Sequence, residues 1–310
     1  MKFRTTGLLL SALLLAGTLL PAFAAEDTAV GSDTVQETVQ GEEDQSGTPF
    51  YLDGAPVSGF SYECFDGTYY VTVESFLRVV CDESAVTESR GVLEGEAIVR
   101  TETVLEPESA DGTAAVEVTE STLTISAAAG RQYVEANGRC IYVKKGVGLV
   151  EGCVALPVRT LAYLCNLSVA YDGSVQLRRV SGAPAFLYSS SWIYDSESLY
   201  WLSRIIYAES GNQSLEGKLA VGNVVMNRVR SARFPDTVKG VIFQKNQFSP
   251  AKSGSVYRTP NAESIAAAKL VLEGVEILPN ALFFNLAGMN TYAARNRTYV
   301  ATIGAHAFYE

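Results

Sequence analysis

Histidine is almost absent from this chain, because the 310 residues contain a single one, His306. A site that binds its metal through two or more imidazoles is therefore excluded, and with it most zinc peptidases and zinc amidases. We expect neither a metal nor a cofactor.

Cysteine is missing from the C-terminal part of the chain. All five cysteines lie earlier: Cys64, Cys81, Cys140, Cys153 and Cys165. They form no C-x-x-C motif, and their odd number leaves at least one of them unpaired in any disulfide scheme. Residues 166–310 therefore have no cysteine nucleophile, which excludes a papain-like peptidase there.

No apolar run is long enough to cross a membrane, which takes roughly 20 residues. The longest such run covers residues 7–20. Lys2 and Arg4 precede it, and residues 22–24 (AFA) follow it as a small-x-small cleavage site. This pattern predicts that residues 1–24 are a signal peptide and that the protein is secreted.

Acidic and basic side chains are distributed unequally along the chain, which carries a net charge of −10. Residues 25–195 hold 26 acidic and 10 basic side chains, whereas residues 196–310 hold 8 and 12. A mildly basic exported domain suits an anionic polymer such as cell wall, although ordinary surface charge explains the excess equally well. There is no basic stripe, so we do not expect binding to nucleic acid.

Composition divides the mature chain into four segments. Residues 25–49 are acidic and poor in large apolar residues, which predicts a disordered linker. Residues 50–180 alternate apolar and polar residues, as in 116–118 (VEV) and 123–125 (LTI), and we expect half-buried strands there. Residues 181–196 contain a proline and a serine run and predict a second linker before a domain at 197–310.

The β-rich segment contains a weak internal repeat. Residues 67–77 (GTYYVTVESFL) and 152–162 (GCVALPVRTLA) each follow a turn and predict a strand that runs into a short helix. The second copy, with residues 154–164 (VALPVRTLAYL) and 169–172 (VAYD), resembles the non-catalytic stalk domain named after the N-terminus of copper amine oxidases. This resemblance implies a stalk of two half-repeats at residues 50–180, with a possible contact to the wall or to a protein.

A carboxylate lies at the end of an expected amphipathic helix at residues 197–209. Leu199, Leu202 and Ile206 share one face of this helix. At about 100° per residue, Glu209 emerges roughly 20° from Leu202, on the apolar face. Loss of hydration there raises the pKa of a carboxyl group, as a general acid near neutral pH requires. A solvated glutamate at a frayed helix end is the alternative interpretation.

The rest of the C-terminal segment carries a resemblance to a known family. Its motifs occur in order at residues 202–210 (LSRIIYAES), 216–221 (EGKLAV), 224–229 (VVMNRV), 234–238 (FPDTV), 240–243 (GVIF), 247–250 (QFSP), 281–285 (ALFFN) and 303–308 (IGAHAF). Over residues 199–309 the chain resembles the SleB/CwlJ cell wall hydrolases, the spore-cortex-lytic family of germination enzymes. The resemblance implies an α+β chain with a helical, lysozyme- or transglycosylase-like domain bearing a small sheet.

The resemblance also implies a reaction. The catalytic glutamate of the family falls on Glu209. The substrate would be the peptidoglycan glycan strand, cut between N-acetylmuramic acid and N-acetylglucosamine by a lytic transglycosylase mechanism. We expect the protein to act as a monomer. A water-using muramidase or glucosaminidase is an alternative, which needs a second carboxylate, with Glu216 and Asp236 as candidates.

Other side chains are candidates for substrate binding or for structure. Gln247 and Phe248 suit a sugar, through an amide and an aromatic face, although a place in the core explains them equally well. Asn285 and Tyr292 are further candidates. Asn227 within an apolar helix is interpreted as a buried brace, and His306 as a hydrogen-bonded structural residue.

Gln213 departs from the family pattern, which usually has a second glutamate there. If that carboxylate assists catalysis, the chain is a wall-binding protein whose catalytic domain has decayed. If it only braces a turn, an amide serves as well.

Overall fold

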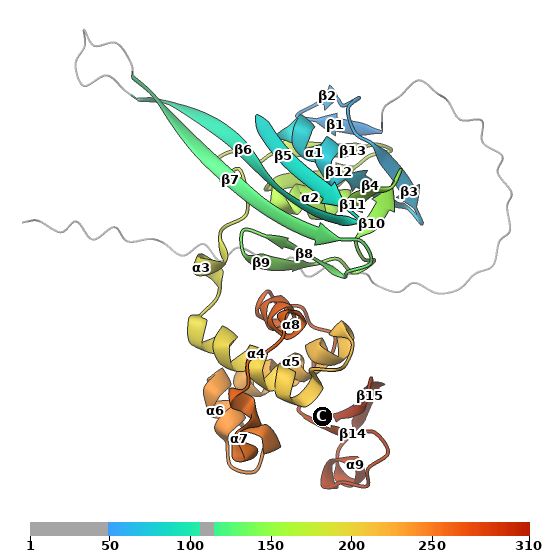
Figure 1. Cartoon of the computed structure of the whole chain (residues 1–310), viewed down its shortest axis with the longest axis vertical. Helices are drawn as coiled ribbons and strands as arrows, with labels where there is room; N and C mark the ends of the chain where they lie inside the picture. Colours follow the sequence, from blue (N-terminus) through green and yellow to red (C-terminus); the bar gives the residue numbers. More distant parts are fainter. Residues whose placement is uncertain (1–48, 106–114) are drawn as a thin grey trace, which may run out of the picture. The chain divides into compact units, whose positions relative to one another are not determined.

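The computed structural model describes residues 49–105 and 115–310. The expected signal peptide at residues 1–24 lies outside the described residues, as does the linker at 25–49 except for its last residue. Within the described ranges, no helix combines the length and the apolar character needed to cross a membrane. The described chain is α+β, as expected, with a β-rich region followed by a helical region that carries a small sheet (Figure 1).

The described part of the N-terminal region forms three sheets and two short helices. Their strand orders are β12-β13-β1-β2, β10-β11-β4-β3 and β5-β6-β7-β8-β9. The bounds are β1 (Phe50–Leu52), β2 (Ala55–Pro56), β3 (Tyr62–Phe65), β4 (Thr68–Thr72), α1 (Val73–Val80), β5 (Glu83–Ser89), β6 (Val92–Leu105), β7 (Ala115–Ala128), β8 (Tyr133–Ala136), β9 (Arg139–Tyr142), β10 (Gly148–Val150), β11 (Cys153–Pro157), α2 (Val158–Leu164), β12 (Leu167–Tyr171) and β13 (Val175–Arg179).

Two strand-strand-helix units, β3-β4-α1 and β10-β11-α2, form one sheet in this region. In each unit the second strand runs directly into the helix. These second strands, β4 and β11, pair antiparallel at the centre of the sheet. The side chain of Thr72 caps α1 by accepting a hydrogen bond from Ser75 N–H. A cysteine follows each helix, Cys81 after α1 and Cys165 after α2, and the two thiols are hydrogen-bonded to each other. The repeated sequence pattern thus corresponds to a repeated structural unit.

Strand β7 is half-buried only along part of its length. Leu123 and Ile125 are buried, as their alternation predicts. The expectation was wrong for Val116 and Val118, which are 54% and 53% exposed. The N-terminal half of β7 pairs only with β6, because β8 pairs with β7 at residues 125–127. No core therefore covers the part of β7 that contains Val116 and Val118.

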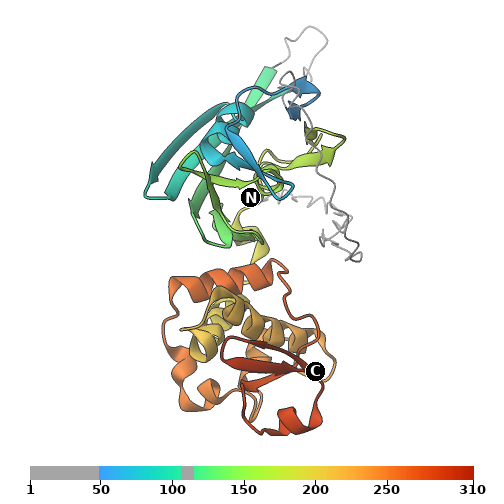
Figure 2. The same ribbon diagram turned by 90° about the vertical axis from the view of Figure 1, so that its right-hand side faces the viewer.

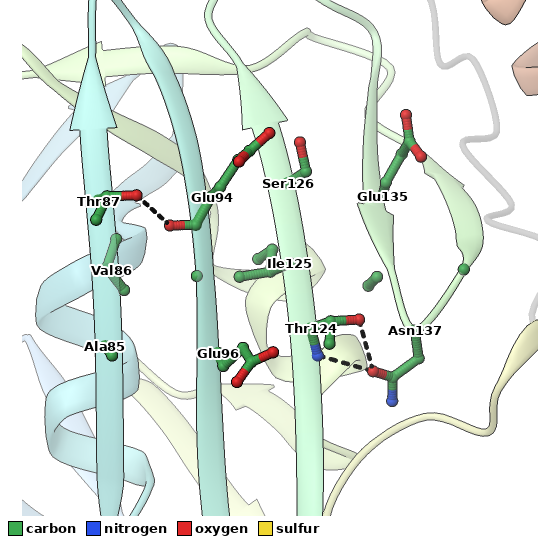
Figure 3. Close-up of a pocket in the computed structure, with 13 residues that line it drawn as sticks. Ala85, Val86, Thr87, Glu94, Glu96, Thr124, Ile125, Ser126, Glu135 and Asn137 are labelled. Carbon is green, nitrogen blue, oxygen red and sulfur yellow. Dashed lines mark hydrogen bonds between the residues drawn. The ribbon is translucent and has the colours of Figure 1, made fainter.

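The five-stranded sheet carries a shallow hollow of about 670 Å³ (Figure 3). Glu94, Glu96 and Glu135 line it, together with Asn137, whose Oδ1 accepts a hydrogen bond from Thr124 N–H at 2.8 Å. Its lining consists entirely of residues from β5 to β8 and the turn that joins β8 to β9.

The segment expected to be a linker, residues 181–196, is more ordered than its composition indicates. It contains the short helix α3 (Ser190–Ile193). Phe186 and Leu187 are buried in the N-terminal core, and Leu187 N–H donates to Leu164 O at 3.1 Å. These two apolar side chains hold the first half of the segment to the preceding domain.

Five α-helices and a three-stranded sheet follow in the described C-terminal region, with a small helix between two of the strands (Figure 2). The bounds are α4 (Ser196–Ser210), α5 (Leu215–Arg230), α6 (Val238–Phe243), α7 (Ser249–Ser253), a 3-10 turn η1 (Ser255–Tyr257), α8 (Ala262–Leu272), β14 (Phe283–Leu286), α9 (Tyr292–Asn296), β15 (Tyr299–Ile303) and β16 (His306–Tyr309). The sheet is antiparallel with the order β14-β16-β15.

Helix α5 runs through the middle of the C-terminal core. Gly222 lies where α4, α5 and α8 meet, since an added Cβ would come within 2.8 Å of Val271 and 3.0 Å of Ile206. Asn227 is buried and donates two hydrogen bonds from Nδ2, to Leu278 O at 2.8 Å and Ala281 O at 3.0 Å. Its interpretation as a buried brace is confirmed, because it holds the segment before β14 against the helix.

Candidate active site

Helix α4 places Glu209 at its C-terminal turn on the apolar side. The side chain of Asp195 caps the helix by accepting a hydrogen bond from Ser198 N–H at 2.8 Å. Leu202 and Ile206 are buried against α5 and α8, and Ser210 is fully buried and donates to Ile206 O at 2.9 Å. Glu209 is half-buried beside them.

Burial raises the pKa of Glu209 to about 7, from an ordinary value of 4.5. Loss of hydration is the cause, since the charged form of a carboxyl group is disfavoured where water is partly excluded. Within residues 49–105 and 115–310, no ion pair or hydrogen bond of the Glu209 carboxyl group is found that would stabilise the charge. The group therefore keeps its proton up to about neutral pH.

Glu209 faces a cavity of about 410 Å³ between two segments. The lining residues are Tyr207, Ala208, Glu209, Gly211, Asn212, Ser255, Arg258 and Asn261. One wall is the end of α4 and the turn after it, and the other is the segment from η1 to the start of α8. The two walls are joined where Asn261 Nδ2 donates to Gly211 O at 3.3 Å. Glu209 is the sole carboxylate in this lining.

Neither candidate for a second catalytic carboxylate lines the cavity. Glu216 lies exposed in the first turn of α5, and Asp236 lies exposed before α6. The cavity thus holds one carboxyl group, that of Glu209, and one permanent cation, the guanidinium of Arg258, among neutral polar groups.

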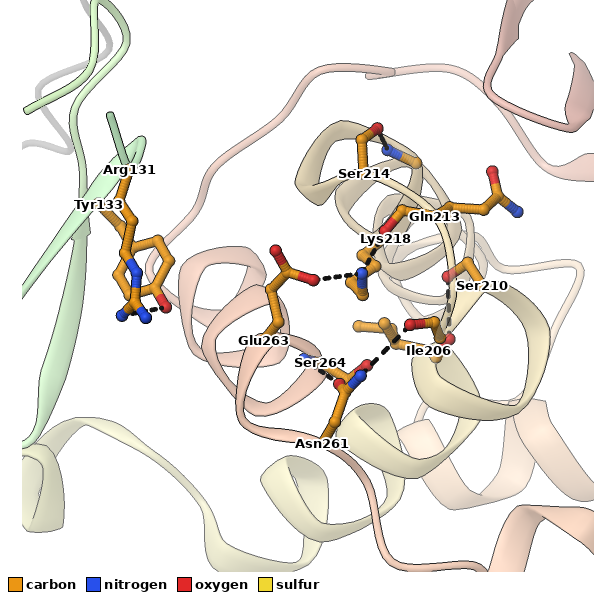
Figure 4. A network of polar contacts seen from close by, with 12 residues as sticks. Arg131, Tyr133, Ile206, Ser210, Gln213, Ser214, Lys218, Asn261, Glu263 and Ser264 are labelled. Carbon is orange, nitrogen blue, oxygen red and sulfur yellow. Dashed lines mark hydrogen bonds and ion pairs between the residues drawn. The ribbon is translucent and has the colours of Figure 1, made fainter. Parts of the chain in front are cut away.

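A buried lysine fastens the turn that follows Glu209 (Figure 4). Lys218 of α5 is fully buried, and its ammonium group donates to the backbone carbonyl of Gln213 and to Glu263 Oε2, the latter at 2.6 Å. Glu263 is in the first turn of α8, so Lys218 joins both walls of the cavity. A charge this deeply buried is retained in proteins when it is paired and hydrogen-bonded, as it is here.

The side chain of Gln213 braces the C-terminal hairpin. Its Nε2 donates to His306 Nδ1 at 3.0 Å, and its Oε1 accepts from Ala305 N–H at 3.1 Å. A Cβ at Gly304, whose φ is +57°, would overlap Gln213 Oε1. These contacts need an amide or a carboxyl group of this length, and none of them needs a proton transfer.

His306 is buried and hydrogen-bonded, so its interpretation as a structural residue is confirmed. Burial lowers its pKa from the ordinary 6.5, because desolvation disfavours the imidazolium. Since Gln213 Nε2 donates to Nδ1, the neutral ring carries its proton on Nε2.

We expect Gln213→Glu to fold and to raise the pKa of His306. A carboxylate next to Nδ1 favours the imidazolium, whereas the present amide favours the neutral ring. The chain has one histidine, so the NMR titration of its ring protons gives this pKa without an assignment step. In the control Gln213→Met, the pKa should stay low while the thermal stability falls. An unchanged titration in Gln213→Glu would contradict the contact between the two side chains.

The four residues predicted to bind substrate lie outside the cavity lining. The prediction that Phe248 binds a sugar was wrong. Its side chain is 4% exposed, and its ring packs on Phe284 and on the Arg228 guanidinium, so no face of the ring is free for a sugar.

The other three predicted residues lie in a turn, a strand and a short helix. Gln247 is exposed in the turn before α7. Asn285 Oδ1 accepts from Thr291 Oγ1 at 2.6 Å, which braces the loop after β14. Tyr292 is exposed in α9.

The structure adds three lining residues that sequence patterns did not indicate: Ser255, Arg258 and Asn261. In the sequence, Thr259 and Pro260 form a typical cap and first position of a helix, with Gly274 as its end. The cap is Asn261 instead, whose side chain accepts from Ser264 N–H at 2.9 Å. The helix ends at Leu272, and Gly274 follows with a φ of +94°. Only the fold shows that this cap also faces Glu209.

A family comparison identifies the C-terminal region. The model of the Cell Wall Hydrolase family matches residues 212–309. These residues form a cell wall hydrolase domain. The match begins just after Glu209, so the role of this residue depends on the resemblance of residues 202–210 and on the geometry of the cavity.

Two curated relatives and one solved structure are similar to part of this chain. The spore cortex-lytic enzyme of Bacillus cereus is 34% identical over 116 residues, covering 37% of this chain and 45% of that enzyme. The spore cortex-lytic enzyme of Oceanobacillus iheyensis is 32% identical over 116 residues, covering 37% of this chain and 42% of that enzyme. The chain thus spans less than half the length of these curated relatives. The catalytic domain of the germination-specific lytic transglycosylase SleB from Bacillus anthracis is 31% identical, with a TM-score of 0.36 over 38% of this chain and 97% of that domain.

Proposed function

We propose that the protein cleaves peptidoglycan glycan strands between N-acetylmuramic acid and N-acetylglucosamine, as a lytic transglycosylase with Glu209 as its acid and base. The hydrolase domain and its relatives support a cell wall substrate. The observation that carries the mechanism is that a single carboxylate with a pKa of about 7 lines the cavity.

The proposed reaction has two proton transfers, and the carboxyl group of Glu209 takes part in both. Glu209 first donates its proton to the bridging oxygen as the bond between this oxygen and C1 of the muramic residue breaks. The resulting carboxylate then removes the proton of the muramic 6-hydroxyl, whose oxygen forms a bond to C1. The products are a 1,6-anhydro end and a free 4-hydroxyl, Glu209 regains its proton, and no water is consumed.

A hydrolytic outcome requires a second carboxylate about 5 to 9.5 Å from the acid, to serve as nucleophile or to activate water. The lining of the cavity supplies none besides Glu209. The decayed-protein alternative also loses its main reason, because Gln213 makes structural contacts that do not need an ionised group.

Mass spectrometry of the products tests the proposal. Purified protein is incubated with peptidoglycan, and the soluble muropeptides are analysed with Glu209→Gln as the inactive control. Muropeptides that end in 1,6-anhydro-muramic acid are the expected result. Reducing ends would assign the domain to hydrolases, and the absence of any product would favour the wall-binding alternative.

The substrate lies outside the cell membrane, so the proposal includes export to the cell wall. The charged start, apolar run and cleavage site in residues 1–24 support it. The stalk at residues 50–180 remains a prediction, with wall or protein contact as its expected role. N-terminal sequencing of the protein recovered from the wall fraction should give a chain that begins at residue 25.

A further inference from the structure

The cavity contains a cation that the proposed chemistry does not use. Arg258 lies on the wall between η1 and α8, whereas Glu209 lies on the wall formed by the end of α4. It is exposed to solvent and is the sole basic side chain of the lining. The remaining polar groups there are uncharged, from Tyr207, Asn212, Ser255 and Asn261.

Arg258 differs from several basic residues of the same domain in having no acidic partner. Lys218 pairs with Glu263, Arg230 with Glu276, and Lys239 with Glu197. No ion pair or side-chain hydrogen bond of Arg258 is found in the described ranges, and its guanidinium is free to bind a ligand.

Arg258 also does not neutralise Glu209. A guanidinium hydrogen-bonded to a carboxylate holds the pKa of the acid low, whereas burial alone determines the raised pKa of Glu209. Below about pH 7 the cavity therefore carries a protonated, uncharged acid on one wall and a positive charge on the other. Such a cavity attracts an anionic ligand.

The proposed substrate alternates between a sugar with an acidic substituent and a sugar without one. N-acetylmuramic acid carries a lactyl group, which ends in a carboxylate or continues into a stem peptide with carboxylates of its own. N-acetylglucosamine carries neither. A single cation on the other wall of the cavity from the acid therefore distinguishes the two sugars by charge.

We propose that Arg258 binds a carboxylate on the muramic side of the glycan strand and thereby sets which glycosidic bond lies against Glu209. The inference rests on the proposed function and adds a specificity residue to it. Arginine suits this role because its planar guanidinium donates two parallel hydrogen bonds to a carboxylate. The neutral groups of Asn212, Ser255 and Asn261 can contact the sugar hydroxyl and acetamido groups shared by both residues.

A binding experiment tests Arg258 independently of turnover. All variants carry Glu209→Gln, so the strands are not cut, and dissociation constants are measured by calorimetry with soluble glycan strands. One set of strands keeps its stem peptides, and a second is treated with an amidase so that only lactyl carboxylates remain. A portion of each set has its carboxylates converted to methylamides.

We expect Arg258→Gln to weaken binding of one carboxylate-bearing set by about 10- to 100-fold, as for the loss of a hydrogen bond to a charged group. Binding of the methylamide sets should change less than twofold. Which set responds more identifies a lactyl or a stem carboxylate as the ligand. Arg258→Lys should recover part of the loss, and the control Lys252→Gln, which removes an exposed charge from α7, should have no effect.

Equal weakening on carboxylate and methylamide strands would overturn the proposal, because Arg258 would then act through the shape of the cavity. No weakening on any strand would overturn it as well. The same strands incubated with protein that retains Glu209 give the products. If binding depends on Arg258 while no anhydro ends form, the proposed reaction fails and the specificity role stands.

Discussion

Replacing Glu209 with glutamine should lower the rate of 1,6-anhydro end formation by about 10²- to 10⁴-fold, the usual contribution of a general acid or base. Glutamine has nearly the same shape, but it can neither donate a proton to the bridging oxygen nor accept one from the 6-hydroxyl. The loss should appear in kcat, whereas binding of glycan strands should be retained. Steady-state release of muropeptides, quantified by mass spectrometry, measures the effect.

Glu216→Gln is the matched control, because it removes a carboxylate that lies exposed in the first turn of α5, outside the cavity. It should leave the rate within about twofold of the original. Full activity in Glu209→Gln, or an equal loss in Glu216→Gln, would remove Glu209 from the mechanism.

The rate should fall with increasing pH above about 7, by about tenfold for each further pH unit. The reason is that the free enzyme must hold its proton on Glu209 before substrate binds, and burial places this pKa at about 7. A profile of kcat/KM between pH 5 and 9.5 on one peptidoglycan preparation gives the value. A basic limb near 4.5, the ordinary pKa of a glutamate, would show that Glu209 is solvated and not the acid.

The same shift predicts the pH dependence of stability. The folded protein retains a proton on Glu209 that the unfolded chain releases above its ordinary pKa of 4.5. The contribution of Glu209 to stability is therefore most favourable below 4.5 and is lost as the pH rises through about 7. Each pKa unit corresponds to about 1.4 kcal/mol, so the rise from 4.5 to about 7 makes the loss at most about 3.5 kcal/mol. Glu209→Gln should thus melt several degrees higher than the original protein at pH 8, and no higher at pH 4.

Helix α4 shows how much of the site could be predicted from the sequence. Its apolar spacing is a local signal, and it predicted the helix to within a residue at each end. The sequence offers Asp195, Ser196 and Ser198 as caps, and the structure selects Asp195. Counting around the helix then placed Glu209 beside Leu202 and Ile206. Local periodicity is informative here because one buried face decides where the whole helix lies.

The positions of Arg258 and Phe248 could not be predicted from the sequence. The segment around Arg258 has no periodic pattern, and its position opposite Glu209 depends on tertiary contacts such as the bond from Asn261 to Gly211. Phe248 and Gln247 are neighbours with opposite exposures, and only the packing of Phe284 and Arg228 decides which of the two is covered. Such contacts join residues that are distant in the sequence, so no local pattern predicts them.

The tight fit between Gln213 and Gly304 constrains how this chain can vary. A side chain at Gly304 would need both an unusual backbone conformation and the space that Gln213 Oε1 now fills. Mutations at the two positions are therefore epistatic: Gly304→Ala should be tolerated better after Gln213 has been shortened than before. Laboratory evolution of this domain should find the two changes together, in that order.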